Sequence, residues 1–259
     1  GYTYAQALNE AMHNDGLDPF YSQKELDVFR DNTNPDFYPN VDWVNETLRN
    51  NSYGDNISVS ARGGGKYVRY YTMLNFLDNR GILKHTNDND GYSTQLKYSR
   101  LNIRTNLDID LTPTTLVQLN LMANFSEHNR PNASTANIFN AIYDVPAALP
   151  IYSKNGGYGA TNTYKNNPVS LIAGTGYSRS QTRAMYADMH LRQNLSAVLP
   201  GLSAGFRIGL DNTASYWNGN SKKPLLKSNT IDLETGKETF SVLQNESSLS
   251  FSKSVGSVI

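Results

Sequence analysis

The stretch Gly201-Leu202-Ser203-Ala204-Gly205 matches G-x-S-x-G, the pattern around the nucleophilic serine of many hydrolases. That chemistry requires a strand before the serine, a helix after it and a histidine base further along the chain. Here the residues after Ser203 alternate as in a strand, and the last histidine, His190, lies upstream. We therefore predict a Pro-Gly turn entering a strand. A hydrolase stays as a rival that an active-site serine probe would test.

Two other short motifs suggest ion or phosphate binding. Asp88-Asn89-Asp90-Gly91 is similar to the centre of a calcium loop. With its glycine at the sixth position, however, Thr86 would stand first and Lys97 twelfth, so two carboxylate ligands are missing. The Gly63-to-Lys66 stretch lacks the first glycine of a phosphate loop and the hydroxyl residue after the lysine. We predict an exposed loop for the first and a hairpin turn for the second.

The remaining reactive residues form no pattern that supports catalysis. The chain has no cysteine, which excludes thiolate chemistry and disulfides. Asp108 and Asp110 are two residues apart on one strand face, about 7 Å along a strand. They could serve as a glycosidase pair, but paired acids on a polar strand face are more often simply solvated. The four histidines show no metal-ligand spacing: His13, His85, His128 and His190. We predict no enzyme activity, metal or cofactor.

Charge and hydropathy narrow the class of protein. The 259 residues carry 23 basic and 23 acidic side chains, a balance that argues against nucleic-acid binding. Mean hydropathy is −0.54, and no apolar run approaches the roughly 18 residues of a membrane-spanning helix. A membrane β-barrel stays open, because its strands alternate and barely raise the average hydropathy.

Residues 1–54 have the pattern of short helices in a polar setting. Thr3 with Gln6 and Ser22 with Glu25 have the spacing of capping boxes, and a further short helix is expected from Trp43 to Leu48. These helices have too little apolar surface to form a domain. We expect them to belong to a large loop.

From residue 55 the apolar period changes from about 3.6 to 2, which indicates β-strands. Six segments alternate clearly, and a seventh, around Leu243 to Lys253, is weaker. On each of these six strands, apolar residues share one face. They are Ile57, Val59, Val68, Leu74, Leu101, Ile103, Leu119, Leu121, Met185, Met189, Leu195, Ala197, Phe206 and Ile208, among others.

The connections between these strands alternate between short and long. Long ones are expected at 78–91, 127–177 and 218–237, and a last short turn at Ser254 to Gly256. This order is typical of an antiparallel up-and-down transmembrane β-barrel with tight periplasmic turns and large extracellular loops. The alternative is a soluble or surface-attached β-sandwich that binds glycans, because half-buried antiparallel sheets alternate in the same way.

The polar faces and the longest loop supply the candidate binding residues. Arg69, Arg104, His190 and Arg192 lie on polar strand faces with Asp108, Asp188, Arg207 and Asp211, and in a barrel they would line the lumen. Tyr152, Tyr158 and Tyr164 lie in the longest connection. Tyrosines there suit stacking on sugars or peptides, or they form an aromatic rim at the membrane interface.

Several stretches carry a resemblance to a known family. LNEAMHNDGLDPFYSQKELDVFRDNTNPDFYPNVDW, from Leu8, is followed by ISVSARGGGKYVRYYTMLNFLDNRGILKHT, from Ile57, and by LNIRTNLDIDLTP. Together they resemble the barrel of SusC-like (SusC/RagA) TonB-dependent outer-membrane transporters of Bacteroidetes. IFNAIYDVPAALPIYSKNGGYG and NNPVSL are similar to that family's large extracellular loop. The likeness spans nearly the whole chain.

The resemblance implies a location, partners and a transport function. Such proteins are multi-pass barrels of 22 strands in the cell outer membrane, with a plug and a TonB box. They import oligosaccharides or peptides beneath a SusD-like surface lipoprotein, using energy passed through TonB. This chain would supply about seven strands, begin in an extracellular loop, end just after a periplasmic turn, and contact outer-membrane lipid. The plug and TonB-box residues lie outside it, and its substrate is not identified.

Overall fold

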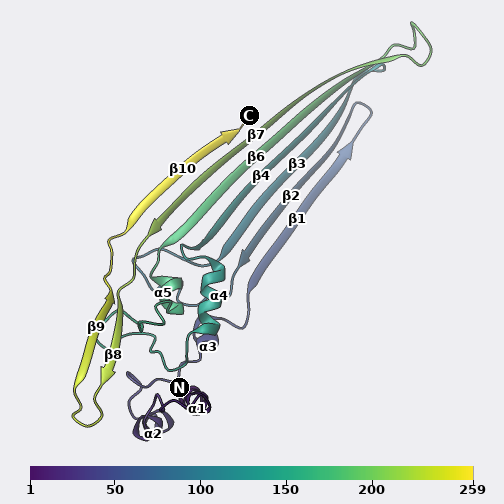
Figure 1. Ribbon diagram of the computed structural model, residues 1–259. Helices are drawn as coiled ribbons and strands as arrows, with labels where there is room; N and C mark the ends of the chain where they lie inside the picture. Colours follow the sequence, from purple (N-terminus) through teal and green to yellow (C-terminus); the bar gives the residue numbers. More distant parts are fainter. Residues whose placement is uncertain (259) are drawn as a thin grey trace.

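The computed structural model describes residues 1–258 and consists mainly of one long antiparallel sheet (Figure 1). Its seven strands pair in chain order, as the sequence predicted. They are β1 (Tyr53–Gly64), β2 (Val68–Arg80), β3 (Lys97–Thr112), β4 (Thr115–Pro131), β6 (Tyr177–Asn194), β7 (Ser203–Ser221) and β10 (Ser250–Val258). Of these, β1 and β10 are the two edges, each paired on one side only within the described residues.

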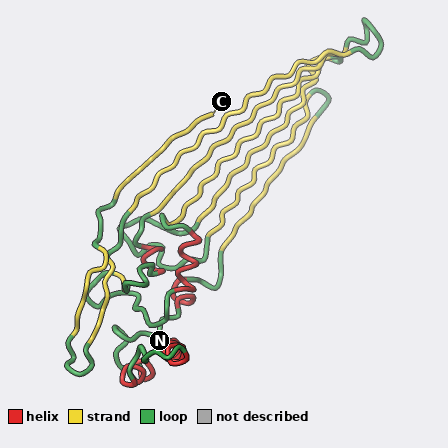
Figure 2. The backbone as a smooth tube through the Cα atoms, in the orientation of Figure 1, coloured by secondary structure: helices red, strands yellow, loops and turns green. Residues whose placement is uncertain are grey.

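Short and long connections fall at opposite ends of this sheet, as Figure 2 shows. The short ones, at 65–67, 113–114 and 195–202, form what we call the turn end. Those at 81–96, 132–176 and 222–249 are long and form the loop end. The Gly63-to-Lys66 stretch ends β1 and enters the turn to β2, and Ser203 begins strand β7, so the predicted hairpin turn and the predicted strand after Gly201 are confirmed.

Five short helices and a small second sheet lie at the loop end (Figure 1). The helices are α1 (Tyr2–Asn14), α2 (Gln23–Asp31), α3 (Trp43–Thr47), α4 (Thr135–Asp144) and α5 (Pro168–Ala173). The second sheet consists of β5 (Tyr158–Gly159), β8 (Leu226–Ile231) and β9 (Glu238–Gln244), in the order β5-β8-β9. In residues 1–258 no helix has the length and hydropathy needed to cross a membrane.

Helix starts follow local side-chain hydrogen bonds, with one prediction wrong. Ser22 and Glu25 form the predicted capping box at the start of α2. The box predicted at Thr3 does not exist, because α1 begins at Tyr2 and Thr3 is therefore inside the helix. The N-cap position is Gly1, which makes no side-chain hydrogen bond. The terminal amino group binds Asn40 instead.

Near the C-terminus two predictions are wrong. The seventh strand was expected near Leu243 to Lys253, but Leu243 belongs to β9 in the small sheet, and the strand of the large sheet is Ser250–Val258. The turn expected at Ser254 to Gly256 lies inside that strand. Serines and glycines fill this strand, so apolar alternation gave no signal for it.

A third prediction is wrong at the end of β6. Leu195 and Ala197 were expected on that strand, but both follow its last residue, Asn194.

Register fixes two chemically different faces on the large sheet. Because strand side chains alternate, each row of paired residues lies on one face. We call the face bearing Ile103, Leu121 and Ile208 the apolar face, and the face bearing Arg104, Asn120 and Asp188 the polar face. Thr72 and Thr105 place two hydroxyl groups on the apolar face. Their Oγ1 atoms lie 3.3 Å apart and hydrogen-bond to each other.

Five successive rows of the apolar face form a continuous surface, which we call the apolar band. Its members are Ile57, Val59, Ala61, Val68, Tyr70, Leu74, Phe76, Leu101, Ile103, Leu107, Ile109, Val117, Leu119, Leu121, Ala123, Phe125, Met185, Ala187, Met189, Leu191, Phe206, Ile208 and Leu210. From Leu101 to Ile109 the band extends about 26 Å along the strand. Many of its side chains are exposed: Leu121 to 50% and Ile208 to 54%.

Candidate functional site

The polar face carries all four charged residues that the sequence singled out. Two of them belong to one row of partners across five strands, which we call the polar row. The polar row consists of Arg69, Asp108, Gln118, His190 and Arg207. The register therefore brings Arg69 on β2 and His190 on β6 onto the same line across the sheet, although they are far apart in sequence.

Hydrogen bonds and ion pairs follow the polar row from strand to strand. Arg69 Nη1 lies 2.5 Å from Asp110 Oδ2, and Arg69 Nε lies 3.9 Å from Asp108 Oδ2. Gln118 donates from Nε2 to Asp108 Oδ1 at 3.1 Å, and its Oε1 lies 3.2 Å from His190 Nδ1. Exposed contacts of this kind contribute little stability. Their effect is to hold the side chains in fixed orientations.

A hollow of about 420 Å³ opens on the polar face beside the polar row. It is lined by Arg104, Asn106, Asn120, Tyr186, Asp188 and Asp211, with Gly209 at its floor. Asp188 accepts a hydrogen bond from Asn120 Nδ2 and forms an ion pair with Arg207 Nε, both at 3.1 Å. Arg104 Nη2 contacts the sulfur of Met122 at 3.7 Å. Its guanidinium therefore remains able to bind a carboxylate or a hydroxyl group.

Of the four charged residues predicted from the sequence, Arg104 lines this hollow, and Arg192 is the one farthest toward the turn end. Arg192 lies on the polar face near the turn end, between Leu116 and Gly205. Asn106 and Gly209 were not among the predicted site residues, although strand parity places both on the polar face. Their positions in the hollow follow only from the register between strands, which the sequence does not give.

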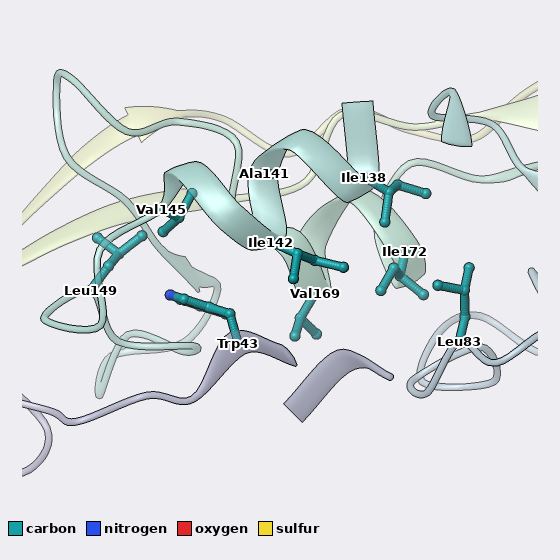
Figure 3. Packing of buried hydrophobic residues seen from close by; sticks show 9 residues of the cluster. All are labelled: Trp43, Leu83, Ile138, Ala141, Ile142, Val145, Leu149, Val169 and Ile172. Atoms are coloured by element: carbon teal, nitrogen blue, oxygen red, sulfur yellow. The ribbon is translucent and has the colours of Figure 1, made fainter. Parts of the chain in front are cut away.

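At the loop end, three long segments share one hydrophobic core, which we call the loop core (Figure 3). It is formed by Trp43, Leu83, Ile138, Ala141, Ile142, Val145, Leu149, Val169 and Ile172. Trp43 Nε1 also donates to the carbonyl of Pro146 at 3.1 Å. The loop end is thus a packed structure, because residues from α3, α4, α5 and the 81–96 connection bury one another.

Asn167 organises the longest connection. It is fully buried and caps α5, where its Oδ1 accepts from the amides of Val169 and Ser170 at 3.1 and 3.2 Å. Its Nδ2 donates to the carbonyls of Ile151 and Gly159 at 2.9 and 3.0 Å. A single side chain therefore links α5 to two other parts of the connection.

The three predicted tyrosines are not equivalent. The rings of Tyr152 and Tyr158 lie 5.5 Å apart, and Tyr152 is 49% exposed. Burial raises the pKa of Tyr158 to about 12, so its hydroxyl is neutral at physiological pH and can donate a hydrogen bond. Tyr164 packs against the loop core. Tyr152 is therefore the one most able to stack on a ligand.

A second cluster joins the N-terminal helices to the β8–β9 hairpin. Phe29, Phe37 and Tyr38 are buried in it, and Ile231 and Phe240 of the hairpin pack against them. Two exposed ion pairs also join the hairpin to other segments. These are Lys24 with Glu234 at 2.6 Å, and Lys154 with Glu238 at 2.5 Å.

The acidic loop motif contacts a histidine and a lysine. Asp88 Oδ2 lies 2.6 Å from His85 Nδ1, whose Nε2 lies 2.9 Å from Glu46. Asp90 pairs with Lys222 at 2.8 Å. In the described part of the chain, no three His, Cys, Asp or Glu residues are grouped as metal ligands would be.

Comparisons with known proteins identify a relative by sequence and a similar solved structure. No protein-family model matches the chain. A protein of Formosa agariphila named TonB-dependent receptor P26 is 31% identical over 136 residues, which are 52% of this chain and 12% of the relative. The structure of the RagAB peptide importer in its "closed-closed" state aligns with a TM-score of 0.50 and 13% identity. That alignment covers 70% of this chain and 20% of the other, so this chain spans a small part of each protein.

Proposed function

We propose that this chain takes part in nutrient import. The premise, which both comparisons support, is that the chain is a relative of the SusC-like TonB-dependent transporters. In this proposal the large sheet is part of a closed outer-membrane barrel that takes up nutrients. The unpaired edges of β1 and β10 would pair with further strands of the whole protein, because open sheet edges are not tolerated in a bilayer. The family resemblance implies 22 strands in total.

The observation that carries this proposal is the exposed apolar band. A sheet with one polar and one apolar face needs an apolar environment against the second face. The apolar band extends about 26 Å along tilted strands, which covers most of the roughly 25 Å belt of an outer-membrane barrel. Lipid would supply the contact that the band lacks.

The β-sandwich alternative requires a second sheet packed over the apolar band. Among residues 1–258, the second sheet and the helices gather at the loop end, beyond the ends of the long strands (Figure 2). Their cores are formed with one another. The arrangement therefore favours the membrane function over a soluble glycan-binding module.

The polar face would then line the transport path. The hollow beside Arg104 offers cationic, anionic and amide groups together, and Tyr152 at the loop end offers an exposed ring. These groups suit an oligosaccharide or a peptide, which present hydroxyl, amide and carboxylate groups. As the resemblance implies, the loop end would meet a SusD-like lipoprotein, and TonB would act through a plug outside this chain.

Filling the hollow tests this path. Gly209 is on its floor, and a Cβ there would meet nothing nearer than the carbonyl oxygen of Ala187 at 3.9 Å. We expect Gly209→Trp in the full-length transporter to lower the initial rate of uptake of labelled peptides or oligosaccharides several-fold. The measurement is uptake by whole cells, normalised to the amount of protein in the outer membrane.

Gly256→Trp is the matched control. Gly256 is also on the polar face, in register with Ser215, and has open space at its Cβ, but it lies outside the hollow. Its uptake should stay close to that of the unmodified transporter. Equal uptake by all three proteins would contradict a transport path along this part of the polar face.

A further inference from the structure

Four basic side chains lie on the apolar face at the loop-end border of the apolar band, one of them within its last row. They are Arg80 on β2, Lys97 on β3, and Arg179 and Arg183 on β6, and we call them the cation patch. The register places Arg80 beside Lys97, and Arg183 beside Phe125. On each of the three strands, the chain passes from apolar to basic residues on the same face.

The cation patch has more positive charge than its neighbours neutralise. Asp78 Oδ1 and Oδ2 lie 3.3 Å from Lys97 Nζ and Arg80 Nε, so one carboxylate serves two cations. Arg179 Nε is 3.9 Å from Glu127 Oε1.

Arg183 has no ion-pair partner among residues 1–258. Asp55 on β1, the register partner of Asp78, adds a third carboxylate on this face, so four cations face three carboxylates.

A hollow of about 250 Å³ lies where the cation patch meets the apolar band. Phe76, Leu101 and Phe125 line it together with Arg183, Gln181 and Glu127. The hollow thus joins apolar side chains to a cation, an amide and a carboxylate, and that carboxylate lies 3.9 Å from Arg179. An amphipathic ligand with a negatively charged group has this distribution of chemistry.

We propose that the cation patch binds the phosphate group of an anionic lipid in the leaflet at the loop end, with the acyl chains along Phe76, Leu101 and Phe125. Guanidinium groups match phosphate geometry with paired hydrogen bonds. Basic clusters beside a bilayer attract anionic headgroups. The inference rests on the proposed membrane function, since it requires the apolar band to face lipid.

The test is lipid binding by the full-length protein in a zwitterionic detergent. The probes are dihexanoyl phosphatidylglycerol, which has an anionic phosphate headgroup, and dihexanoyl phosphatidylcholine, which is zwitterionic. We expect phosphatidylglycerol to bind more tightly than phosphatidylcholine. Replacing Arg80, Lys97, Arg179 and Arg183 together by Gln should weaken phosphatidylglycerol binding roughly 600-fold at low salt, from about fivefold per basic residue. Inorganic phosphate at the same concentration should not compete.

The matched control removes four cations from the polar face, by replacing Arg62, Arg104, Arg130 and Arg192 with Gln. It should bind phosphatidylglycerol as the unmodified protein does. Arg183→Gln alone should weaken binding several-fold, and Arg183→Lys should retain most of it, which keeps the test valid if the fourfold variant fails to fold. Equal loss in patch and control variants, or equal affinity for both lipids, would overturn the proposal.

Failure of this inference can be told apart from failure of the import function. If the apolar band contacts lipid but phosphatidylglycerol and phosphatidylcholine bind alike, only the cation patch assignment is wrong. If spin-labelled lipid does not contact the band at all, the membrane function itself is wrong, and the cation patch assignment fails with it.

Discussion

Leu121→Arg should destabilise the membrane-inserted protein by about 2–4 kcal/mol, the cost of an arginine at the bilayer midplane on the lipid side of a barrel. Leu121 belongs to the third of the five rows of the apolar band, between Thr105 and Ala187, so it would lie near the midplane. Denaturant unfolding of the full-length protein in lipid vesicles would measure this decrease in the free energy of unfolding.

Asn120→Arg is the control for this substitution. The two positions are adjacent on β4, but Asn120 is on the polar face, where its Nδ2 lies 3.1 Å from Asp188. An arginine there can pair with that carboxylate, so the change in unfolding free energy should be under about 1 kcal/mol. Equal destabilisation by both substitutions would mean that the two faces share one environment, which contradicts a membrane barrel.

Asn167→Asp should loosen the longest connection while leaving the strands intact. The new carboxylate could still accept from the amides of Val169 and Ser170, but it would turn an acceptor oxygen toward the carbonyls of Ile151 and Gly159. A buried charge without a partner costs roughly 3–5 kcal/mol. Hydrogen exchange of the α5 amides should therefore become much faster.

The pH dependence of that variant has a definite sign. Burial against carbonyl oxygens would raise the pKa of the new carboxyl above its unfolded value, so lowering the pH should restore protection by protonating it. Asn166→Asp is the control, because Asn166 is exposed. Similar exchange in both variants would show that Asn167 does not hold the connection together.

Strand alternation was sufficient to predict six of the seven strands of the large sheet and their two faces. Segments such as Leu101 to Leu111 alternate over their whole length, so parity assigns each side chain to a face before any contact is known. It placed Arg69, Arg104, His190 and Arg192 on the polar face. Parity alone does not give register, and register is what puts Arg69 and His190 in one row and leaves Arg192 apart.

The loop end could not be predicted in the same way. Trp43, Leu83, Ile138 and Ile172 form one core, yet they come from separate segments with no shared period. From the sequence alone, Asn167 would be assigned as an ordinary polar loop residue. Its role depends on backbone carbonyl groups that come within hydrogen-bond distance only in the folded loop. The small sheet was missed because its strands are short and because α5, β6 and β7 lie between β5 and β8 along the chain.

Lipid contact along β3, β4 and β7 is the most direct measurement of the central claim, that this sheet is part of a membrane barrel. Fluorescent labels would be placed singly at Ile103, Leu121 and Ile208 on the apolar face, and at Arg104 and Asn120 on the polar face. In vesicles containing a lipid-phase quencher, the first three labels should be quenched and the last two should not. Equal quenching on both faces, or no quenching on either, would contradict the account.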